Sequence, residues 1–81
     1  MMSKYAALHE HLLRQTASRV TMTFEEIAEI VPGGLPASAY NHSAWWANQE
    51  ADGHPHARSW LDAGYRTEAV NPTSRRVTFA R

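Results

Sequence analysis

The C-terminal segment, residues 65–81, most constrains what this chain can fold into. It contains two runs with strand character, YRTEAV and RRVTFA, separated by NPTS, a group of residues that favour turns. In the second run Val77 and Phe79 fall on one face. In the first run the alternating positions that share a face are Tyr65, Thr67 and Ala69. The pattern predicts a β-hairpin.

A shorter strand is predicted upstream, in RVTMTF, where apolar and polar residues alternate. It leads directly into TFEE, whose Thr23 and Glu26 have the S/T-x-x-E spacing of a capping box. A helix should therefore follow Thr23 and run to about Val31, where PGG ends it.

Three further helices are predicted from apolar spacing, Pro at a first helical position and Gly after a last turn. The first should cover about 4–15 with Ser3 as its N-cap, and the others about 36–42 and 55–63, the last closed by Gly64. The apolar stripe of the first helix is formed by Tyr5, Ala6, Leu8, Leu12 and Leu13. In the last helix Trp60 and Leu61 are the expected core residues.

The predicted order is helix, strand, helix, helix, a further helix, then a β-hairpin. This is an α+β chain with the element order of winged-helix domains, in which the short strand pairs with the hairpin and the third helix faces DNA. With 81 residues and no visible linker, we expect one winged-helix-like domain over residues 1–81. The absence of cysteine excludes disulfides and cysteine-based zinc sites.

Charge is distributed unevenly although the formal net charge is zero. Acidic residues gather at 25–29, residues 30–49 carry no formal charge, and five Arg against two acidic residues give residues 58–81 a balance of +3. Such asymmetry can orient a small domain on a polyanion, although a mixed solvated surface explains it as well. No membrane span or signal peptide is visible, so a cytoplasmic protein is expected.

The uncharged segment LPASAYNHSAWWANQ, residues 35–49, holds most of the polar and aromatic candidates. Adjacent side chains alternate in extended structure, so one of Trp45 and Trp46 should be in the core and the other exposed or half-exposed. Of the two, we expect Trp45 to be the more buried.

Double-stranded DNA is the partner that these residues favour. Asn can bond to adenine, Arg to guanine or phosphate, and Ser and Tyr to phosphate. The predicted contacts are Ser38, Tyr40, Asn41 and His42 on the third helix, Trp46 and Asn48 after it, Arg58, and Arg75 and Arg76 at the start of the last strand.

The main alternative is a protein–protein module or homodimer that uses Tyr40 and an exposed tryptophan. His42, His54 and His56 have two interpretations. They could bind a metal ion, with Glu50 and Asp52 as the nearest acidic residues, or they could be helix-capping and surface residues. Ser38, Ser43 and His42 carry no nucleophile-elbow or phosphate-loop pattern. We therefore expect no enzyme activity, no metal and no cofactor.

The chain also resembles a family of small, largely uncharacterised bacterial domains. The resemblance rests on KYAAL, TFEEI, LPASA, WWAN, SWLDAGY and VTFAR, and covers Lys4 to Arg81. It implies a domain unit and no defined activity. Similar sequences usually carry Arg after LPASA, whereas this chain has Tyr40 followed by Asn41. If the basic residues of similar sequences contact phosphate, then in this chain Tyr40 and Asn41 would contact it through neutral hydrogen bonds instead.

Overall fold

A computed structural model describes residues 3–49 and 55–81 of the chain. Its elements, in chain order, are α1 (Ala6–Leu13), β1 (Arg19–Thr23), α2 (Phe24–Ile30), α3 (Ala37–Asn41), the 3₁₀ turn η1 (Ser43–Trp46), α4 (Pro55–Leu61), β2 (Arg66–Asn71) and β3 (Arg76–Ala80). The predicted α+β class and C-terminal hairpin are therefore confirmed.

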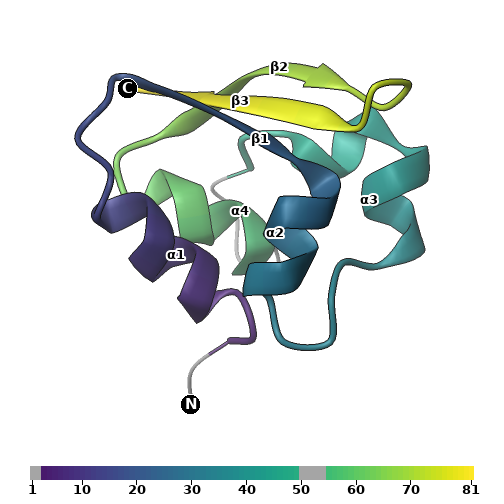
Figure 1. Ribbon diagram of the computed structural model, residues 1–81, viewed down its shortest axis with the longest axis horizontal. Coiled ribbons are helices and arrows are strands. Elements are labelled where there is room, and N and C mark those ends of the chain that lie inside the picture. Colours follow the sequence, from purple (N-terminus) through teal and green to yellow (C-terminus); the bar gives the residue numbers. More distant parts are fainter. Residues whose placement is uncertain (1–2, 50–54) are drawn as a thin grey trace.

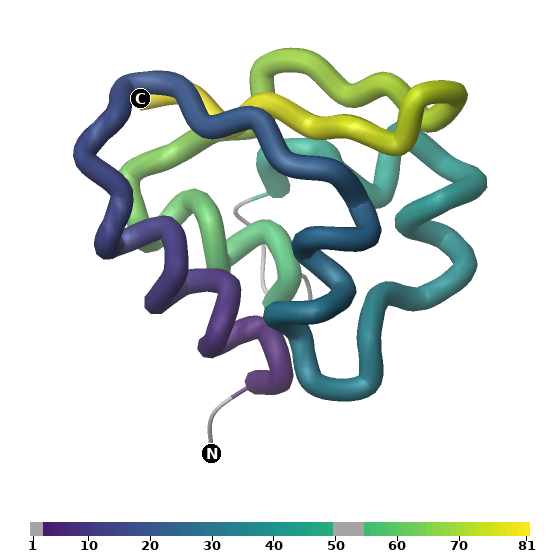
Figure 2. The backbone as a smooth tube through the Cα atoms, viewed as in Figure 1, coloured from purple at the N-terminus to yellow at the C-terminus, as the bar shows by residue number. Residues whose placement is uncertain are grey.

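The three strands form one antiparallel sheet in the order β1–β3–β2. The last strand lies in the middle because it pairs with both others, with Phe79 opposite Val20 on one side and Thr67 on the other. The backbone N–H of Arg81 also donates to the carbonyl oxygen of Ser18, so the C-terminus lies beside the segment that precedes β1 (Figure 2).

The helices lie against one face of this sheet, and no helix of the described chain covers the other face (Figure 1). On the uncovered face Arg19 of β1 reaches Glu68 of β2 with a nitrogen–oxygen distance of 2.7 Å. The bridge spans the central strand, where the small side chain of Ala80 lies opposite Arg19 and leaves room for it.

The core between the helices and the sheet is built largely from aromatic rings. Trp46 stacks on Phe24 with 4.9 Å between ring centroids, and on Trp60 at 5.9 Å, while Trp60 contacts Phe79 from the sheet. All four side chains are almost completely buried. Large rings supply the buried apolar area that so short a chain needs.

Local signals in the sequence account for several element ends. Thr23 and Glu26 form the predicted capping box, with each side chain accepting from the other's backbone N–H at 3.0 and 2.9 Å. Gly64 follows α4 with φ of +88°, a conformation in which a Cβ atom is unfavourable. These two predictions are confirmed.

The first helix differs from its prediction at both ends. It covers Ala6–Leu13 instead of 4–15, because Ser3 accepts the Tyr5 N–H and holds a turn ahead of the helix instead of capping its first turn. Leu13 is 51% exposed, so its assignment to the apolar stripe is wrong. Leu8 and Leu12 fill the positions that face the core.

The hairpin contains an irregularity that the alternating pattern did not indicate. Between Thr67 and Ala69 the register with β3 shifts, and Glu68 is the extra residue of a β-bulge. The bulge reverses the alternation after Thr67, so Ala69 is exposed and Val70 faces the helices. The prediction that Ala69 shares a face with Tyr65 and Thr67 is therefore wrong.

Candidate nucleic-acid interface

Helix α3 lies beside the turn that joins β2 and β3 (Figure 1). The two are in contact through Arg75, whose guanidinium carbon lies 5.3 Å from the ring centroid of Tyr40. Tyr40 in turn packs edge-on against Phe24, with 5.7 Å between centroids. The core therefore holds Tyr40, and Tyr40 provides a platform for the arginine of the turn.

The turn itself is defined by backbone interactions. The side-chain oxygen of Asn71 accepts the Ser74 N–H at 3.1 Å, and Arg75 has φ of +55°. The carbonyl oxygen of Arg75 accepts from the Phe24 N–H at 2.8 Å, which extends the β1–β3 ladder to the start of α2. Arg75 lies over the ring of Tyr40, while Arg76 pairs with Thr23 in the β1–β3 ladder.

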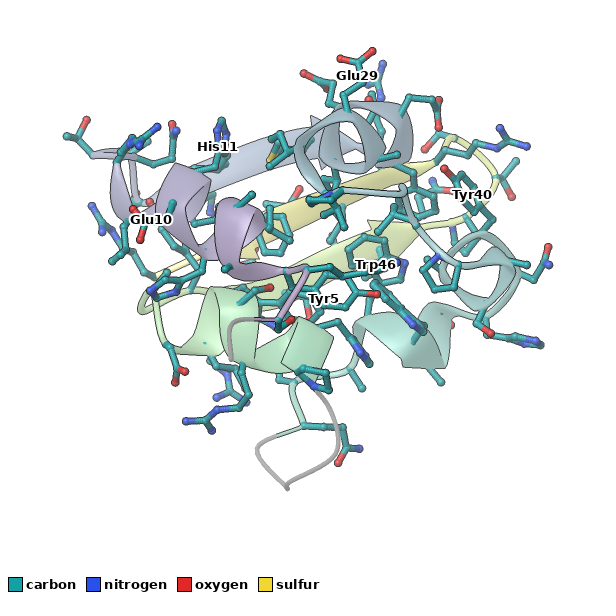
Figure 3. The ribbon with its side chains drawn as sticks, turned by 90° about the horizontal axis from the view of Figure 1, so that it is seen from below. Tyr5, Glu10, His11, Glu29, Tyr40 and Trp46 are labelled. Carbon is teal, nitrogen blue, oxygen red and sulfur yellow. The ribbon has the colours of Figure 1, made fainter. Side chains whose placement is uncertain are left out.

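The other polar residues predicted as DNA contacts lie on α3 and at its C-terminal cap. Ser38, Asn41 and His42 are exposed, while Tyr40 is half-buried. The buried residue of the helix is Ala39, which anchors it to the core. Of these four residues, Tyr40, labelled in Figure 3, is the one in contact with Arg75, while the other three lie on the same helix or at its cap.

A carboxylate lies near Arg76, whose partner in the β1–β3 ladder is Thr23. The pKa of Glu26 is lowered by the Thr23 backbone N–H and hydroxyl, with smaller contributions from the positive charges of Arg76 and His11. Glu26 therefore stays ionised and offsets part of the charge of Arg76.

The two tryptophans have the opposite roles from those expected. Trp46 is 1% exposed and its Nε1–H donates to the Ala39 carbonyl oxygen at 2.9 Å, whereas Trp45 is half-buried. The expectation assumed extended backbone, but both residues lie in a 3₁₀ turn, where neighbours are about 120° apart. Trp46 is thus too buried for the predicted DNA contact.

Trp45 packs flat against His56 of α4, with 4.1 Å between ring centroids and 10° between planes. It also meets the edge of Trp46. Trp45 is thus the half-exposed member that was expected of the pair, with its ring partly covered by His56.

Asn48 has a structural position instead of the predicted DNA contact. Its Oδ1 accepts from the Trp60 indole at 3.0 Å and from the Thr67 N–H at 2.9 Å, and also lies 3.1 Å from the Thr67 hydroxyl. Its Nδ2 donates to the Thr67 carbonyl oxygen at 3.0 Å. These bonds engage the whole amide within the protein. The sequence showed an Asn after two Trp, and nothing in it identified these partners.

Arg58 lies in another part of the molecule, on α4. Its guanidinium bonds Asp62 one turn later at 2.7 Å. Both residues border an open pocket of about 160 Å³ between α1 and α4, away from α3 (Figure 1). Arg58 therefore does not join the cluster of Tyr40 and Arg75.

The described part of the chain holds no group of three or more His, Asp or Glu side chains placed to bind a metal ion. His42 and His56 belong to different elements, α3's C-terminal cap and α4. His54, Glu50 and Asp52, which the metal hypothesis also named, lie outside the described residues.

Among residues 3–49 and 55–81, no helix has the length and apolar character that spanning a membrane requires.

Comparison with known proteins assigns the chain to a family without assigning an activity. A family model described as "Domain of unknown function (DUF7662)" matches residues 5–81. No curated protein and no solved structure matches the chain. The match covers nearly the same residues as the resemblance seen in the sequence, which confirms that resemblance.

Proposed function

The chain belongs to the DUF7662 family, a domain of unknown function, and we propose that it is a DNA-binding domain of the winged-helix type. The strand order β1–β3–β2 supports this, because the short first strand pairs with the C-terminal hairpin as it does in winged-helix domains. In this comparison the β2–β3 turn is the wing and α3 is the helix that faces DNA. Unrelated functions share one fold, so function depends on the residues of the site.

The observation that carries the proposal is the contact of Arg75 with Tyr40. It joins a basic turn to a helix whose exposed side chains are hydrogen-bonding groups without charge. A guanidinium that rests on an aromatic ring keeps its N–H groups available at the rim of the contact, and it loses less conformational freedom when it meets a phosphate.

The chemistry of α3 fits a nucleic-acid edge or backbone. Asn41 can bond an adenine in the bidentate manner, and Ser38 and His42 can donate to phosphate oxygens. The proposed contact set is therefore Ser38, Tyr40, Asn41, His42, Arg75 and Arg76.

The test compares two variants that remove the same charge. Arg75→Ala/Arg76→Ala removes both arginines of the turn, and Arg14→Ala/Arg58→Ala removes two exposed arginines from α1's end and α4. Binding to a random-sequence duplex is measured at several salt concentrations. Wild type should show a log–log slope of about two, one for each arginine of the turn that neutralises a phosphate.

The turn variant should lose affinity and reduce the slope by about two, while the matched variant should bind as wild type does. An equal loss in both variants would indicate a non-specific charge effect. Absence of binding by wild type at low salt would refute the proposal.

A further inference from the structure

The two outer edges of the sheet differ in how they are closed. On β2 the Thr67 N–H and carbonyl oxygen both bond the side-chain amide of Asn48, as they would bond a neighbouring strand. The bulge at Glu68 disturbs the same edge. Both features prevent another chain from pairing with β2.

The edge of β1 has no such closure. In an antiparallel pair, alternate residues exchange hydrogen bonds with the partner strand and the residues between them point outward. Phe24 bonds Arg75 and Arg81 bonds Ser18, so the even-numbered residues of β1 face β3. Arg19, Thr21 and Thr23 therefore direct their backbone groups away from the sheet.

One of these three residues is already satisfied. The Thr23 N–H donates to Glu26 within the capping box. No bond within the described residues engages the outward N–H and carbonyl groups of Arg19 and Thr21. The open edge consists of these two residues, with half-buried Val20 between them.

We propose that a second copy of this chain pairs with this edge, β1 against β1, in an antiparallel dimer with its two-fold axis at Val20. In this register Arg19 lies opposite the partner's Thr21 and Thr21 opposite the partner's Arg19. Each is a hydrogen-bonded pair, so the outward groups of both residues are all used. A two-fold axis makes the interface self-complementary and closes it at two copies.

The side chains suit this register as well. The central pair, Val20 with the partner's Val20, is of the closely spaced kind, about 4.5 Å between Cα atoms, on the apolar side of the sheet. β-Branched residues pair well in such positions. The two-fold axis also adds the partner's three strands to these three and removes the open edge of both copies.

The helices beneath the sheet are complementary in charge across the same axis. α1 lies under the start of β1 and α2 near its end (Figure 1), so an antiparallel partner places its α1 beside this chain's α2. α2 carries Glu25, Glu26 and Glu29, while His11 and Arg14 lie at the end of α1. Figure 3 shows Glu29 and His11 on the same side of the molecule. The acidic α2 thus meets His11 and Arg14 of the partner's α1, whereas Glu10 points to another side of that helix (Figure 3).

This dimer uses a different surface from the DNA interface and does not depend on it. The test is a matched pair of variants at the exposed residue Thr21. Both variants lose the Thr21 hydroxyl and its hydrogen bond to the Thr78 hydroxyl, so this loss does not distinguish them. Thr21→Glu places a carboxylate opposite the partner's Arg19, and Thr21→Lys places a like charge there. The two-fold axis doubles each effect.

Sedimentation velocity over a wide range of concentrations should show a reversible dimer for wild type. Thr21→Glu should lower the dimer dissociation constant and Thr21→Lys should raise it, by about two- to thirtyfold in each direction for two cross-strand pairs. Hydrogen exchange at the Arg19 and Thr21 amides should slow as the dimer forms.

Three outcomes would overturn the inference. The first is a wild type that remains monomeric at millimolar concentration, because no dimer then forms. The second is a dimer in which the two variants change the dissociation constant in the same direction. The third is a dimer in which the amides of Arg19 and Thr21 exchange at the same rate at all concentrations. The last two results would show that the interface does not have the β1 register.

Discussion

The side chain of Asn48 pairs with the backbone of Thr67 through both its oxygen and its nitrogen, at 2.9 and 3.0 Å. A single residue thus takes the place of a fourth strand at the edge of β2. The same oxygen receives the indole N–H of Trp60 and so ties the sheet to α4. The final residue of the WWAN motif is thereby explained by structure rather than by contact with a ligand.

Replacing Asn48 should therefore destabilise the fold. Asn48→Ala leaves the Trp60 indole and the Thr67 N–H without their acceptor, and we expect a loss of about 2–4 kcal/mol in the free energy of unfolding. Urea denaturation measures it. The exposed Asn41→Ala serves as control and should change stability by less than about 0.5 kcal/mol. Similar losses in both variants would show that Asn48 has no special role.

The two tryptophans should respond unequally to the same substitution. Trp46→Phe removes the donor to the buried Ala39 carbonyl and leaves a gap beside Phe24, so a cost of about 1–3 kcal/mol is expected. Trp45→Phe keeps a ring against His56 at a half-buried position and should cost less than about 1 kcal/mol. The reverse order in urea denaturation would contradict the burial described for the pair.

The capping box predicts a pH-dependent contribution to stability. The pKa of Glu26 is lowered from its ordinary 4.5, first by the Thr23 N–H that its carboxylate accepts. The ionised carboxylate therefore stabilises the fold above the unfolded pKa, and this contribution disappears as the pH falls through the lower folded value. The free energy of unfolding, measured by urea denaturation, should be larger for wild type than for Glu26→Gln at neutral pH. The two values should approach each other as the pH falls. A difference that stays constant from neutral pH to pH values well below 4.5 would exclude this origin.

Gly64 should resist substitution because of its backbone and not because of crowding. An added Cβ atom would meet nothing within 4 Å, yet φ is +88°. Gly64→Ala should cost about 1 kcal/mol, and Gly64→Asn should cost less since Asn tolerates left-handed conformations better. The thermal unfolding temperatures of wild type, Gly64→Asn and Gly64→Ala should decrease in this order. An Ala variant as stable as wild type would show that the turn after α4 can adopt another conformation.

Tyr40 gives a separate test of the DNA proposal. Tyr40→Phe keeps an aromatic face beneath Arg75 and should retain most of the affinity for duplex DNA, whereas Tyr40→Ala removes the platform and should weaken binding several-fold. Fluorescence anisotropy with a labelled duplex measures both, after circular dichroism has established that each variant is folded. If Tyr40→Phe binds as weakly as Tyr40→Ala, the hydroxyl is the contact and the ring is not the platform.

Much of the fold followed from local rules in the sequence. The TFEE capping box, the glycine after α4 and the NPTS turn each act over a few neighbouring residues, so their consequences can be read without knowledge of the rest of the chain. The apolar positions Val77 and Phe79 likewise identified the buried face of the last strand.

Other features depended on residues that are distant in the chain. The 3₁₀ turn made Trp46 the buried member of its pair, and a bulge at Glu68 reversed the faces of the residues that follow. Asn48 found its partners 12 and 19 residues away, at Trp60 and Thr67. None of these has a short-range signal, because each arises where packed elements must satisfy polar groups that burial has removed from water.

The candidate site divides in the same way. The sequence by itself determined that a polar, uncharged helix and a basic turn exist, since residue type and turn chemistry are local. Only the tertiary structure decided that Arg75 rests on Tyr40 while Arg58 lies elsewhere and Trp46 and Asn48 face inward. The physical reason is that three-dimensional packing, and not spacing along the chain, sets which side chains share a surface.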